Sequence, residues 1–317
     1  TPLFRAVVSI ADDFKTENLV DTLLTSGADA FHICSSHKVP LHVAIAISKY
    51  STANTLFEHM NQSPEFEKTL DTNKKSFVQN CAEVSMHLLA LDILAMYPNW
   101  IEHKDKNKNT ILHSIAEGGS VETLDFVIHL EHFSLLEFVQ MTNHKKRNPL
   151  HIAAGLDRIE VIQELLRAIN NPELANSLLT SEDAHGLSAV HYAALRGSFY
   201  TLDFFVNSLP HVLQALTRTK QTVLHAAVAG SANASCIRLL MSIGMDVNAK
   251  DSTGRSPLFY IFRNQTNSRL DLLRVLLEEF DADTTIINED GQSFIAEASM
   301  TQDCQEIMDL LSEFENE

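Results

Sequence analysis

The chain has 317 residues, of which 45% are hydrophobic and 21% are charged, and its formal net charge is -17 at pH 7. This composition is ordinary for a folded protein and too apolar for a disordered chain. The strong negative charge argues against general nucleic-acid binding, because the phosphate backbone is itself anionic. No apolar run approaches the roughly 18 residues that a membrane-spanning helix needs, and the first residues show no signal-peptide pattern.

The cysteines are far apart and form no CxxC pair; they are Cys34, Cys81, Cys236 and Cys304. In a chain of this length they indicate reduced thiols rather than a disulfide framework. We therefore expect a cytoplasmic protein, with the nucleus as the alternative. The sequence starts at Thr1, inside a repeated motif and not at a methionine, and we expect a fragment of a longer protein.

A four-residue motif recurs along the whole chain and opens with Thr, Ser or Asn in eight of its nine copies. Its clearest form is Thr110-Ile-Leu-His113, and five copies end in histidine. The copies at Ser76 and Ser293 are weak, but they fall where the period demands them. The copies begin at residues 1, 39, 76, 110, 148, 188, 222, 256 and 293. Such fixed-period similarity is the signature of a repeat architecture.

Each copy predicts the start of a helix. Thr, Ser and Asn cap a helix N-terminus by accepting a backbone N–H, and four copies continue with proline, which suits the first helical position. Small residues follow, as in Ala226-Ala227, and then a stretch with apolar residues at helical spacing, as between Val161 and Leu166. Each period therefore predicts a pair of helices.

Two of the longer intervals between successive motif copies have their extra residues in segments 134–142 and 170–180. Their apolar content predicts a longer second helix, or an additional helical turn. Residues 62–72 are the most loop-like part of the chain.

The repeat resembles the ankyrin family, whose unit of about 33 residues opens with T-P-L-H-x-A. The best match runs from Gln221 to Gly254 and reads Thr-Val-Leu-His-Ala-Ala, then Ile237-Arg-Leu-Leu240, then Gly244-Met-Asp-Val-Asn248. The resemblance covers nearly the whole chain. It implies an all-α solenoid of about nine stacked helix pairs, with projecting β-turn fingers and a concave groove. It also implies one monomeric repeat domain over residues 1–317.

Fifteen histidines raise the question of a metal site. Five occupy the fourth motif position, where the resemblance implies hydrogen bonds between neighbouring repeats and too large a separation to share one ion. His129 and His132 have the one-turn spacing of a metal pair, but the sequence nearby supplies no third ligand, which favours a solvated helix face. No phosphate loop, GxSxG, HExxH or EF-hand motif is present. We expect no metal, no cofactor, no catalytic residue and no enzymatic activity.

Basic residues gather in or beside the turns between repeats, which hold thirteen of the 24 Lys and Arg residues. In an ankyrin-like stack these turns project as fingers, so an acidic body would carry a basic ridge. Such a ridge predicts contact with an acidic protein segment or with lipid phosphates; plain solvation of exposed turns is the alternative. Four of its lysines stand where the family usually has glycine: Lys74, Lys108, Lys146 and Lys220. The other nine residues are Lys38, Lys75, Lys104, Lys106, Lys145, Arg147, Arg218, Lys250 and Arg255.

The resemblance further implies that partners bind the fingers and the exposed faces of the first helices. Aromatic and arginine side chains dominate interface energy. On that face this favours Tyr192, Arg196, Tyr260 and Arg263. For Tyr192 the alternative is packing against the next repeat. The predicted partner-binding residues on the helices are Ser114, Glu117, Leu156, Tyr192, Leu195, Arg196, Tyr260, Arg263 and Asn264. Those on the fingers are Lys108, Lys145, Lys146, Arg147 and Lys220.

One further pattern concerns modification. The spacing of Leu240, Asp246 and Asn248 resembles, within the ankyrin family, a site for an asparaginyl hydroxylase, which would modify Asn248. The same residues also serve the turn structurally, which is the alternative. A mass increase of one oxygen on Asn248 in cell-derived protein would decide between them.

Together these observations predict a protein–protein interaction scaffold. The alternatives are a regulatory, autoinhibitory array for an enzyme or channel domain of the same chain, and a phosphoinositide-binding array of a trafficking protein that contacts anionic lipid. The expected partner is a protein, as an acidic peptide segment or another domain of the same chain, and not a nucleic acid.

Overall fold

The computed structural model describes residues 1–9, 12–35, 37–131, 133–264, 269–300 and 304–314. These residues form α-helices and short 3-10 helices without a β-strand; an isolated antiparallel bridge joins Ile287 and Ser293. The chain divides into two compact units. Unit 1 comprises Thr1–His144 and Gln163–Ile169, and unit 2 comprises Lys145–Ile162 and Asn170–Glu317.

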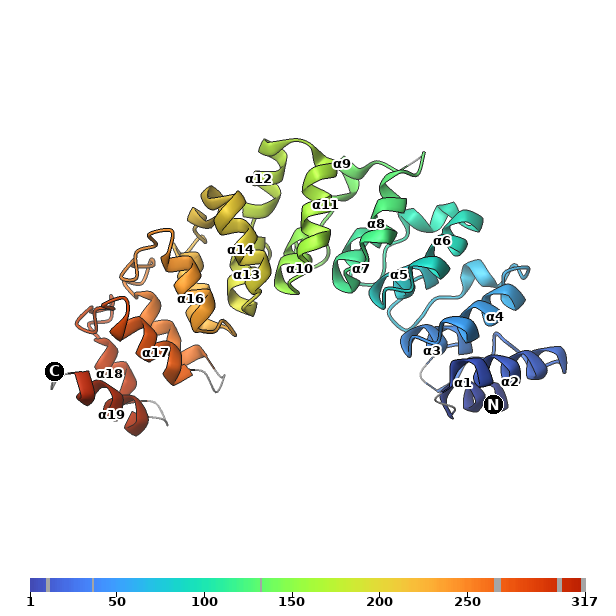
Figure 1. Cartoon of the computed structure of the whole chain (residues 1–317), viewed down its shortest axis with the longest axis horizontal. Helices are drawn as coiled ribbons and strands as arrows, with labels where there is room; N and C mark the ends of the chain where they lie inside the picture. The colour runs from blue at the N-terminus through green and yellow to red at the C-terminus, as the bar shows by residue number, and fades with distance from the viewer. Residues whose placement is uncertain (10–11, 36, 132, 265–268, 301–303, 315–317) are drawn as a thin grey trace. The chain divides into compact units, whose positions relative to one another are not determined.

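Unit 1 is built from successive helix pairs (Figure 1). The first helices of the pairs form one row, because α1 contacts α3, α3 contacts α5 and α5 contacts α7. The second helices form another row through the contacts α2–α4, α4–α6 and α6–α8. The bounds are α1 (Pro2–Ser9), α2 (Asp13–Thr25), α3 (Pro40–Ala46), α4 (Tyr50–Met60), η1 (Phe66–Lys68), α5 (Phe77–Glu83), α6 (His87–Met96), η2 (Pro98–Glu102), α7 (Ile111–Gly118), α8 (Val121–Ile128) and α9 (Leu135–Phe138).

Unit 2 has the same two-row arrangement. In its first row α10 contacts α13, α13 contacts α15, α15 contacts η4 and η4 contacts α18, while α14, α16 and α17 follow one another in the second row. The bounds are α10 (Pro149–Gly155), α12 (Pro172–Thr180), α13 (Ala189–Arg196), α14 (Phe199–Ser208), η3 (Pro210–Gln214), α15 (Val223–Ala229), α16 (Ala234–Met241), η4 (Pro257–Arg263), α17 (Arg269–Glu278), α18 (Phe294–Ala298) and α19 (Cys304–Phe314). Helix α11 (Ile159–Ile169) belongs partly to each unit.

A helix begins directly after the first residue of every motif copy, including the two weak ones. Ser76 Oγ accepts a hydrogen bond from the N–H of Gln79 at 3.3 Å, and Ser293 Oγ accepts one from the N–H of Ala296 at 3.2 Å. Both serine side chains therefore cap the N-termini of their helices, as the sequence analysis expected. The helix after the eighth copy, η4, is a 3-10 helix rather than an α-helix.

The two long segments contain additional helices, as their apolar content predicted. Helices α9 and α12 fill them, and Phe138 and Leu179 from these helices are buried. By contrast, residues 62–72 are not simply a loop. They carry η1, which buries Phe66 completely, with ring centroids 4.9 Å from Phe77 and 5.3 Å from Trp100. Full burial of such a ring contributes about 1.5–3 kcal/mol, which explains why this polar segment folds back onto the core.

Neighbouring first helices in unit 1 approach closely. A Cβ atom on Gly118, the last residue of α7, would lie 1.8 Å from the carbonyl oxygen of Ala82 in α5. Helices α5 and α7 can pack at this separation only because residue 118 has no side chain. None of the described helices combines the length and the apolarity that a membrane crossing requires.

Candidate functional site

The turns before the helix caps form fingers with one recurring geometry. In the turn at residues 105–109, the backbone N–H of Asp105 bonds to the carbonyl oxygen of Asn109 at 3.1 Å. The Asp105 carboxylate accepts the N–H groups of Asn107 and Asn109 at 2.7 and 2.8 Å. Asp71, Asp183, Asp251 and Asn288 close their turns in the same way. These acidic or amide side chains, which the sequence analysis did not single out, set the shape of their five fingers, and the Thr217 hydroxyl accepts the N–H of Gln221 at 3.0 Å in another.

Backbone hydrogen bonds join adjacent fingers within each unit. In unit 1 the N–H of Lys106 bonds to the carbonyl oxygen of Asn73 at 2.8 Å. In unit 2 the N–H of Ser252 bonds to the carbonyl oxygen of Thr219 at 2.7 Å. Side chains at equivalent finger positions are thereby brought next to one another.

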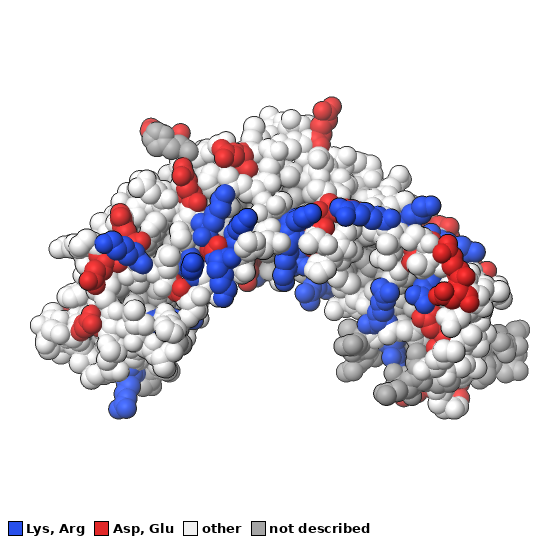
Figure 2. All heavy atoms as spheres, turned by 180° about the vertical axis from the view of Figure 1, so that it is seen from behind, with Lys and Arg blue, Asp and Glu red and all other residues white. Residues whose placement is uncertain are grey.

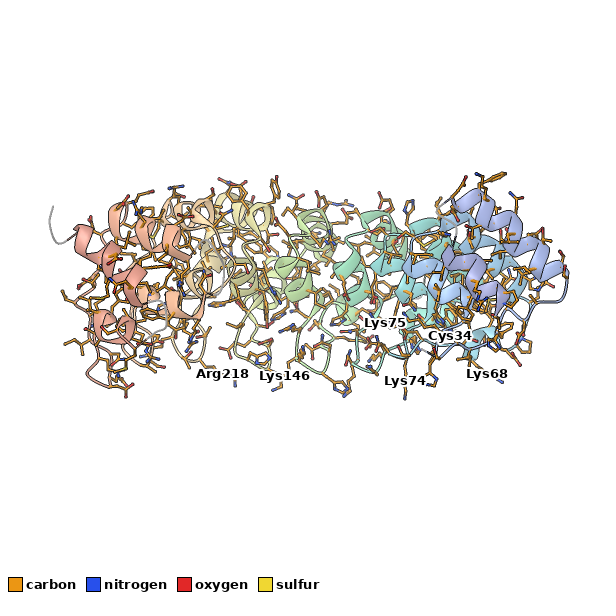
Figure 3. The ribbon with its side chains drawn as sticks, turned by 90° about the horizontal axis from the view of Figure 1, so that it is seen from below. Cys34, Lys68, Lys74, Lys75, Lys146 and Arg218 are labelled. Atoms are coloured by element: carbon orange, nitrogen blue, oxygen red, sulfur yellow. The ribbon has the colours of Figure 1, made fainter. Side chains whose placement is uncertain are left out.

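Four fingers carry a lysine at a left-handed backbone position. The φ angles are 58° at Lys74, 62° at Lys108, 57° at Lys146 and 57° at Lys220, and the equivalent Gly254 has 75°. The left-handed region costs a residue with a Cβ about 1–2 kcal/mol relative to the right-handed one. All four lysine side chains are exposed. Figure 3 shows Lys74 in unit 1 and Lys146 in unit 2 at the outer ends of their loops.

The predicted basic ridge is smaller than the sequence suggested. Four of its thirteen members are neutralised by ion pairs within the chain, namely Lys75 with Glu83, Arg147 with Asp183, Arg218 with Glu182 and Arg255 with Glu297. The ridge lysines that are exposed and make no ion pair among the described residues are Lys74, Lys104, Lys106 and Lys108 in unit 1, and Lys146, Lys220 and Lys250 in unit 2. Lys145 is exposed as well. Figure 2 shows groups of Lys and Arg side chains on one face of the molecule.

Tyr192 is a correction to the predicted partner-binding set. Only 6% of this residue is exposed, and its hydroxyl donates to Oδ2 of Asp183 at 2.8 Å. Arg147 donates from Nε to the same oxygen at 3.0 Å, and its guanidinium lies 4.4 Å from the tyrosine ring centre. Burial raises the pKa of Tyr192 to about 12, and the hydrogen bond to Asp183 adds to this. Tyr192 and Arg147 are thus engaged in bracing a finger.

Tyr260 repeats this arrangement two repeats later and is corrected for the same reason. It is 4% exposed, its hydroxyl donates to Oδ2 of Asp251 at 2.6 Å, and Gln221 donates to the tyrosine oxygen at 2.7 Å. Arg263 is exposed, and its guanidinium lies 4.6 Å from the ring centre of Tyr260. Each tyrosine therefore ties its own finger to the last residue of the preceding one.

Two polar members of the predicted set are also buried, and this too is a correction. Ser114 donates to Oε1 of Glu83 at 3.1 Å, and Asn264 donates from Nδ2 to the carbonyl oxygen of Val228 at 3.1 Å. Both satisfy groups in the preceding repeat instead of facing a partner. The other helix positions are accessible: Glu117 and Arg196 are exposed, Leu195 is half-buried, and Leu156 is 47% exposed. For these four, and for Arg263, partner binding stays a prediction.

Three motif histidines, His151, His191 and His225, join successive repeats through their Nε2 atoms. His225 Nδ1 accepts the N–H of Thr222 at 3.0 Å, so its Nε2 carries the proton and donates to the carbonyl oxygen of Arg255 at 3.1 Å. Gln79 takes over this role in the weak third copy by donating to the carbonyl oxygen of Asn109 at 2.9 Å. Burial lowers the pKa of His42, His151 and His191 to about 4 and also lowers that of His225.

In the described part of the chain, no group of three or more His, Cys, Asp or Glu side chains is arranged so that it could hold a metal ion. His129 is the exposed residue directly after α8 (Val121–Ile128), and its Nδ1 lies 2.6 Å from the carbonyl oxygen of Asp125. His132 lies outside the described residues.

The predicted modification site lies in the turn after α16. Asn248 is half-buried; its N–H donates to Oδ1 of Asp246 at 2.8 Å, and its Oδ1 accepts the N–H of Asp283 at 2.9 Å. The asparagine thus has a structural role between repeats, and its hydroxylation stays a prediction.

Comparison with known proteins identifies the repeats. Family models for ankyrin repeats in three copies match residues 165–251 and 190–288, and a model for a single ankyrin repeat matches residues 145–177. The chicken (Gallus gallus) nuclear factor NF-kappa-B p105 subunit is 26% identical over 202 residues, which cover 63% of this chain and 20% of that protein. The human transient receptor potential cation channel subfamily A member 1 is 26% identical over 193 residues, covering 58% of this chain and 16% of the channel protein. Human NF-kappa-B inhibitor alpha is 30% identical over 122 residues, covering 37% of this chain and 36% of the inhibitor.

The matched segments thus span a fifth or less of the first two of these relatives. The helix pairs, the capped motif copies and the hydrogen-bonded fingers agree with the family matches. Residues 145–288 of the chain match ankyrin-repeat family models, and such repeats indicate a protein–protein interaction domain.

Proposed function

We propose that the chain is an interaction scaffold that binds an acidic segment of a partner protein through the lysines of its fingers. The observation that carries this proposal is the presence of Lys74, Lys108, Lys146 and Lys220 at left-handed positions. Glycine would occupy these positions without steric cost. Residues held in unfavourable backbone regions cluster at functional sites, where the strain is compensated by what the side chain does.

The finger lysines of unit 1 form the densest group. They comprise Lys74, Lys104, Lys106 and Lys108, and the hydrogen bond from Lys106 to Asn73 holds the two fingers together. A single exposed ion pair contributes only about 0–1 kcal/mol. Recognition therefore requires several carboxylates on one segment, each meeting a different lysine, and the affinity should fall as salt screens the charges.

An acidic peptide segment fits this group better than a whole acidic surface. The body of the chain is strongly negative, with a net charge of -17, and it would repel a partner that is acidic over a broad area. A narrow segment can lie along the fingers without approaching the rest of the body. An anionic membrane presents the broad surface that this argument disfavours.

The experiment compares a fluorescent peptide of alternating glutamate and glycine with vesicles containing phosphoinositides. We expect saturable, salt-sensitive binding of the peptide, weakened by Lys74→Glu with Lys108→Glu. The matched control is Arg5→Glu with Lys15→Glu, which reverses two exposed charges in the first helix pair, outside the fingers. Binding of vesicles but not of peptide would replace this proposal with the lipid one, and equal effects of both double variants would refute a finger site.

A second candidate is a regulatory array that acts on another domain, either of its own chain or of a partner. It is favoured by the relatives, because one is named an inhibitor of NF-kappa-B and another is named a member of a cation channel subfamily. The same lysine fingers would then hold an acidic segment of the regulated domain. We further propose a cytoplasmic location, supported by the buried thiols of Cys81 and Cys236.

A further inference from the structure

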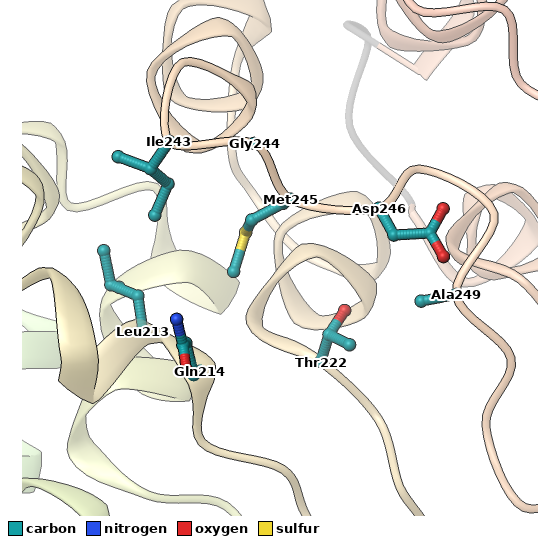
Figure 4. A pocket seen from close by; sticks show the side chains of 8 residues that line it. All are labelled: Leu213, Gln214, Thr222, Ile243, Gly244, Met245, Asp246 and Ala249. Atoms are coloured by element: carbon teal, nitrogen blue, oxygen red, sulfur yellow. The ribbon is translucent and has the colours of Figure 1, made fainter.

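A small apolar pocket lies in unit 2, away from the finger lysines. It is bounded by the end of η3 and by the segment that follows α16, and its volume is about 180 Å³. Figure 4 shows the side chains of Leu213, Ile243 and Met245 directed toward one another, with the carboxylate of Asp246 beyond them. Leu213 is fully buried, whereas Ile243 and Met245 remain half-buried. The pocket therefore presents an apolar lining to a ligand or a side chain that enters it.

The volume restricts what the pocket can hold. Ligand and cofactor sites usually measure about 300–1,000 Å³, so this pocket is too small for a drug-sized molecule. A cavity of about 150 Å³ lined by aliphatic and aromatic side chains is known to hold benzene. The pocket thus matches one aliphatic or aromatic side chain of a protein.

The negative charge beside the pocket indicates which kind of residue the partner carries next to that apolar side chain. Asp246 is exposed, and one of its oxygens accepts the N–H of Asn248 at 2.8 Å. The side chain of Asn248 in turn accepts the N–H of Asp283, which is also exposed. Neither carboxylate forms an ion pair with a Lys or Arg of the described residues. The lining of the apolar pocket therefore contains one carboxylate, that of Asp246.

We propose that this pocket receives one bulky apolar side chain of a partner protein, while an arginine or lysine of the same segment pairs with Asp246. The partner segment is thus basic, opposite in charge to the segment proposed for the fingers. The net charge of -17 favours its approach. Apolar burial supplies the anchor and the Asp246 carboxylate selects the neighbouring cation, as in interfaces where a central anchor is surrounded by polar contacts.

The test uses the whole chain with its methionine methyl groups labelled with carbon-13, and the signal of Met245 is identified with Met245→Leu. The probes are short glycine–serine peptides that carry one leucine and one arginine at increasing distance from it. We expect at least one spacing to shift the Met245 signal saturably with a dissociation constant of roughly 1 mM. Replacing the leucine of that peptide by alanine should abolish the shift.

Two variants separate the pocket from its charge. Ala249→Leu places a larger side chain in the pocket lining and should abolish binding, whereas Asp246→Asn keeps an oxygen for the N–H of Asn248 and should weaken binding about three- to tenfold. Asp290→Asn, an exposed charge in the last finger, is the matched control and should have no effect. Thermal midpoints equal to that of the unmodified chain establish that the variants fold. The proposal is overturned if no spacing shifts Met245, if the alanine peptide binds equally, or if Asp246→Asn binds as before.

Discussion

The hydroxyl of Tyr192 donates a 2.8 Å hydrogen bond to Oδ2 of Asp183, nine residues earlier in the chain. The acceptor is the carboxylate whose other oxygen closes the finger turn through the N–H groups of His185 and Leu187. Burial by itself would raise the pKa of Asp183, but the hydrogen bonds from Tyr192, from Arg147 and from the N–H groups of the turn together lower it below its usual value. A residue of the helix layer thereby determines how rigidly a finger is held.

Tyr192→Phe tests this brace. We expect a loss of about 1.5–3 kcal/mol in the free energy of unfolding, because a buried carboxylate loses a hydrogen bond. The pKa of Asp183 should rise in the variant. Urea denaturation and titration by NMR measure the two effects. Tyr200→Phe is the control, since Tyr200 is 68% exposed, and it should change stability by no more than about 0.5 kcal/mol. Equal stability of both variants would contradict the brace.

Acid should destabilise the chain through its buried histidines. The pKa of His151 is about 4 in the folded chain against 6.5 for the free side chain. Between these values the unfolded state binds more protons, so stability is complete above pH 6.5 and is lost as the pH falls toward 4. The slope is about 1.4 kcal/mol per pH unit for each such histidine. Urea denaturation at a series of pH values measures it.

Gln79 suggests the matched variant for this prediction. Because glutamine makes the equivalent bond in the third repeat, His151→Gln should fold at pH 7. The slope of stability against pH should then be smaller by the contribution of one histidine. An unchanged slope between pH 6.5 and 4 would mean that His151 does not titrate as described.

Glycine substitutions test the packing of the first helices. Gly118→Ala should cost at least about 1–3 kcal/mol, because its Cβ would lie 1.8 Å from the backbone oxygen of Ala82. Gly155 also ends a first helix, α10, one motif position earlier, but a Cβ there would come no closer than 3.6 Å to Tyr192. Gly155→Ala should therefore be neutral or stabilise by up to about 1 kcal/mol. Thermal or urea unfolding distinguishes them, and similar costs for both would contradict the described separation of α5 and α7.

Helix starts could be predicted from the sequence because they depend on local chemistry. A capping side chain such as Ser76 acts on an N–H three residues away, and the repeat period located even the weak copies. The finger lysines were predictable for a similar reason, since a position that usually holds glycine indicates a left-handed backbone.

Side chains that act between repeats were harder to predict. Arg147 looked like a free cation because its partner, Asp183, lies 36 residues further on. Tyr192 looked like a groove residue because its direction depends on where the finger carboxylate is held. Ser114 and Asn264 were assigned to the surface by motif position, although each has an acceptor in the preceding repeat. Such pairings depend on how neighbouring repeats pack against each other, and the sequence of one repeat does not reveal that packing.

The most direct measurement replaces Lys74 and Lys108 by glycine and follows stability and binding together. If these lysines are retained for binding, the variant should be more stable by about 0.5–1 kcal/mol per site, because relief of the left-handed strain of about 1–2 kcal/mol outweighs the entropy cost of glycine, about 0.5–1 kcal/mol. Its affinity for the glutamate–glycine peptide should fall about three- to tenfold. A variant that gains stability and binds the peptide with unchanged affinity and unchanged salt dependence would contradict the account.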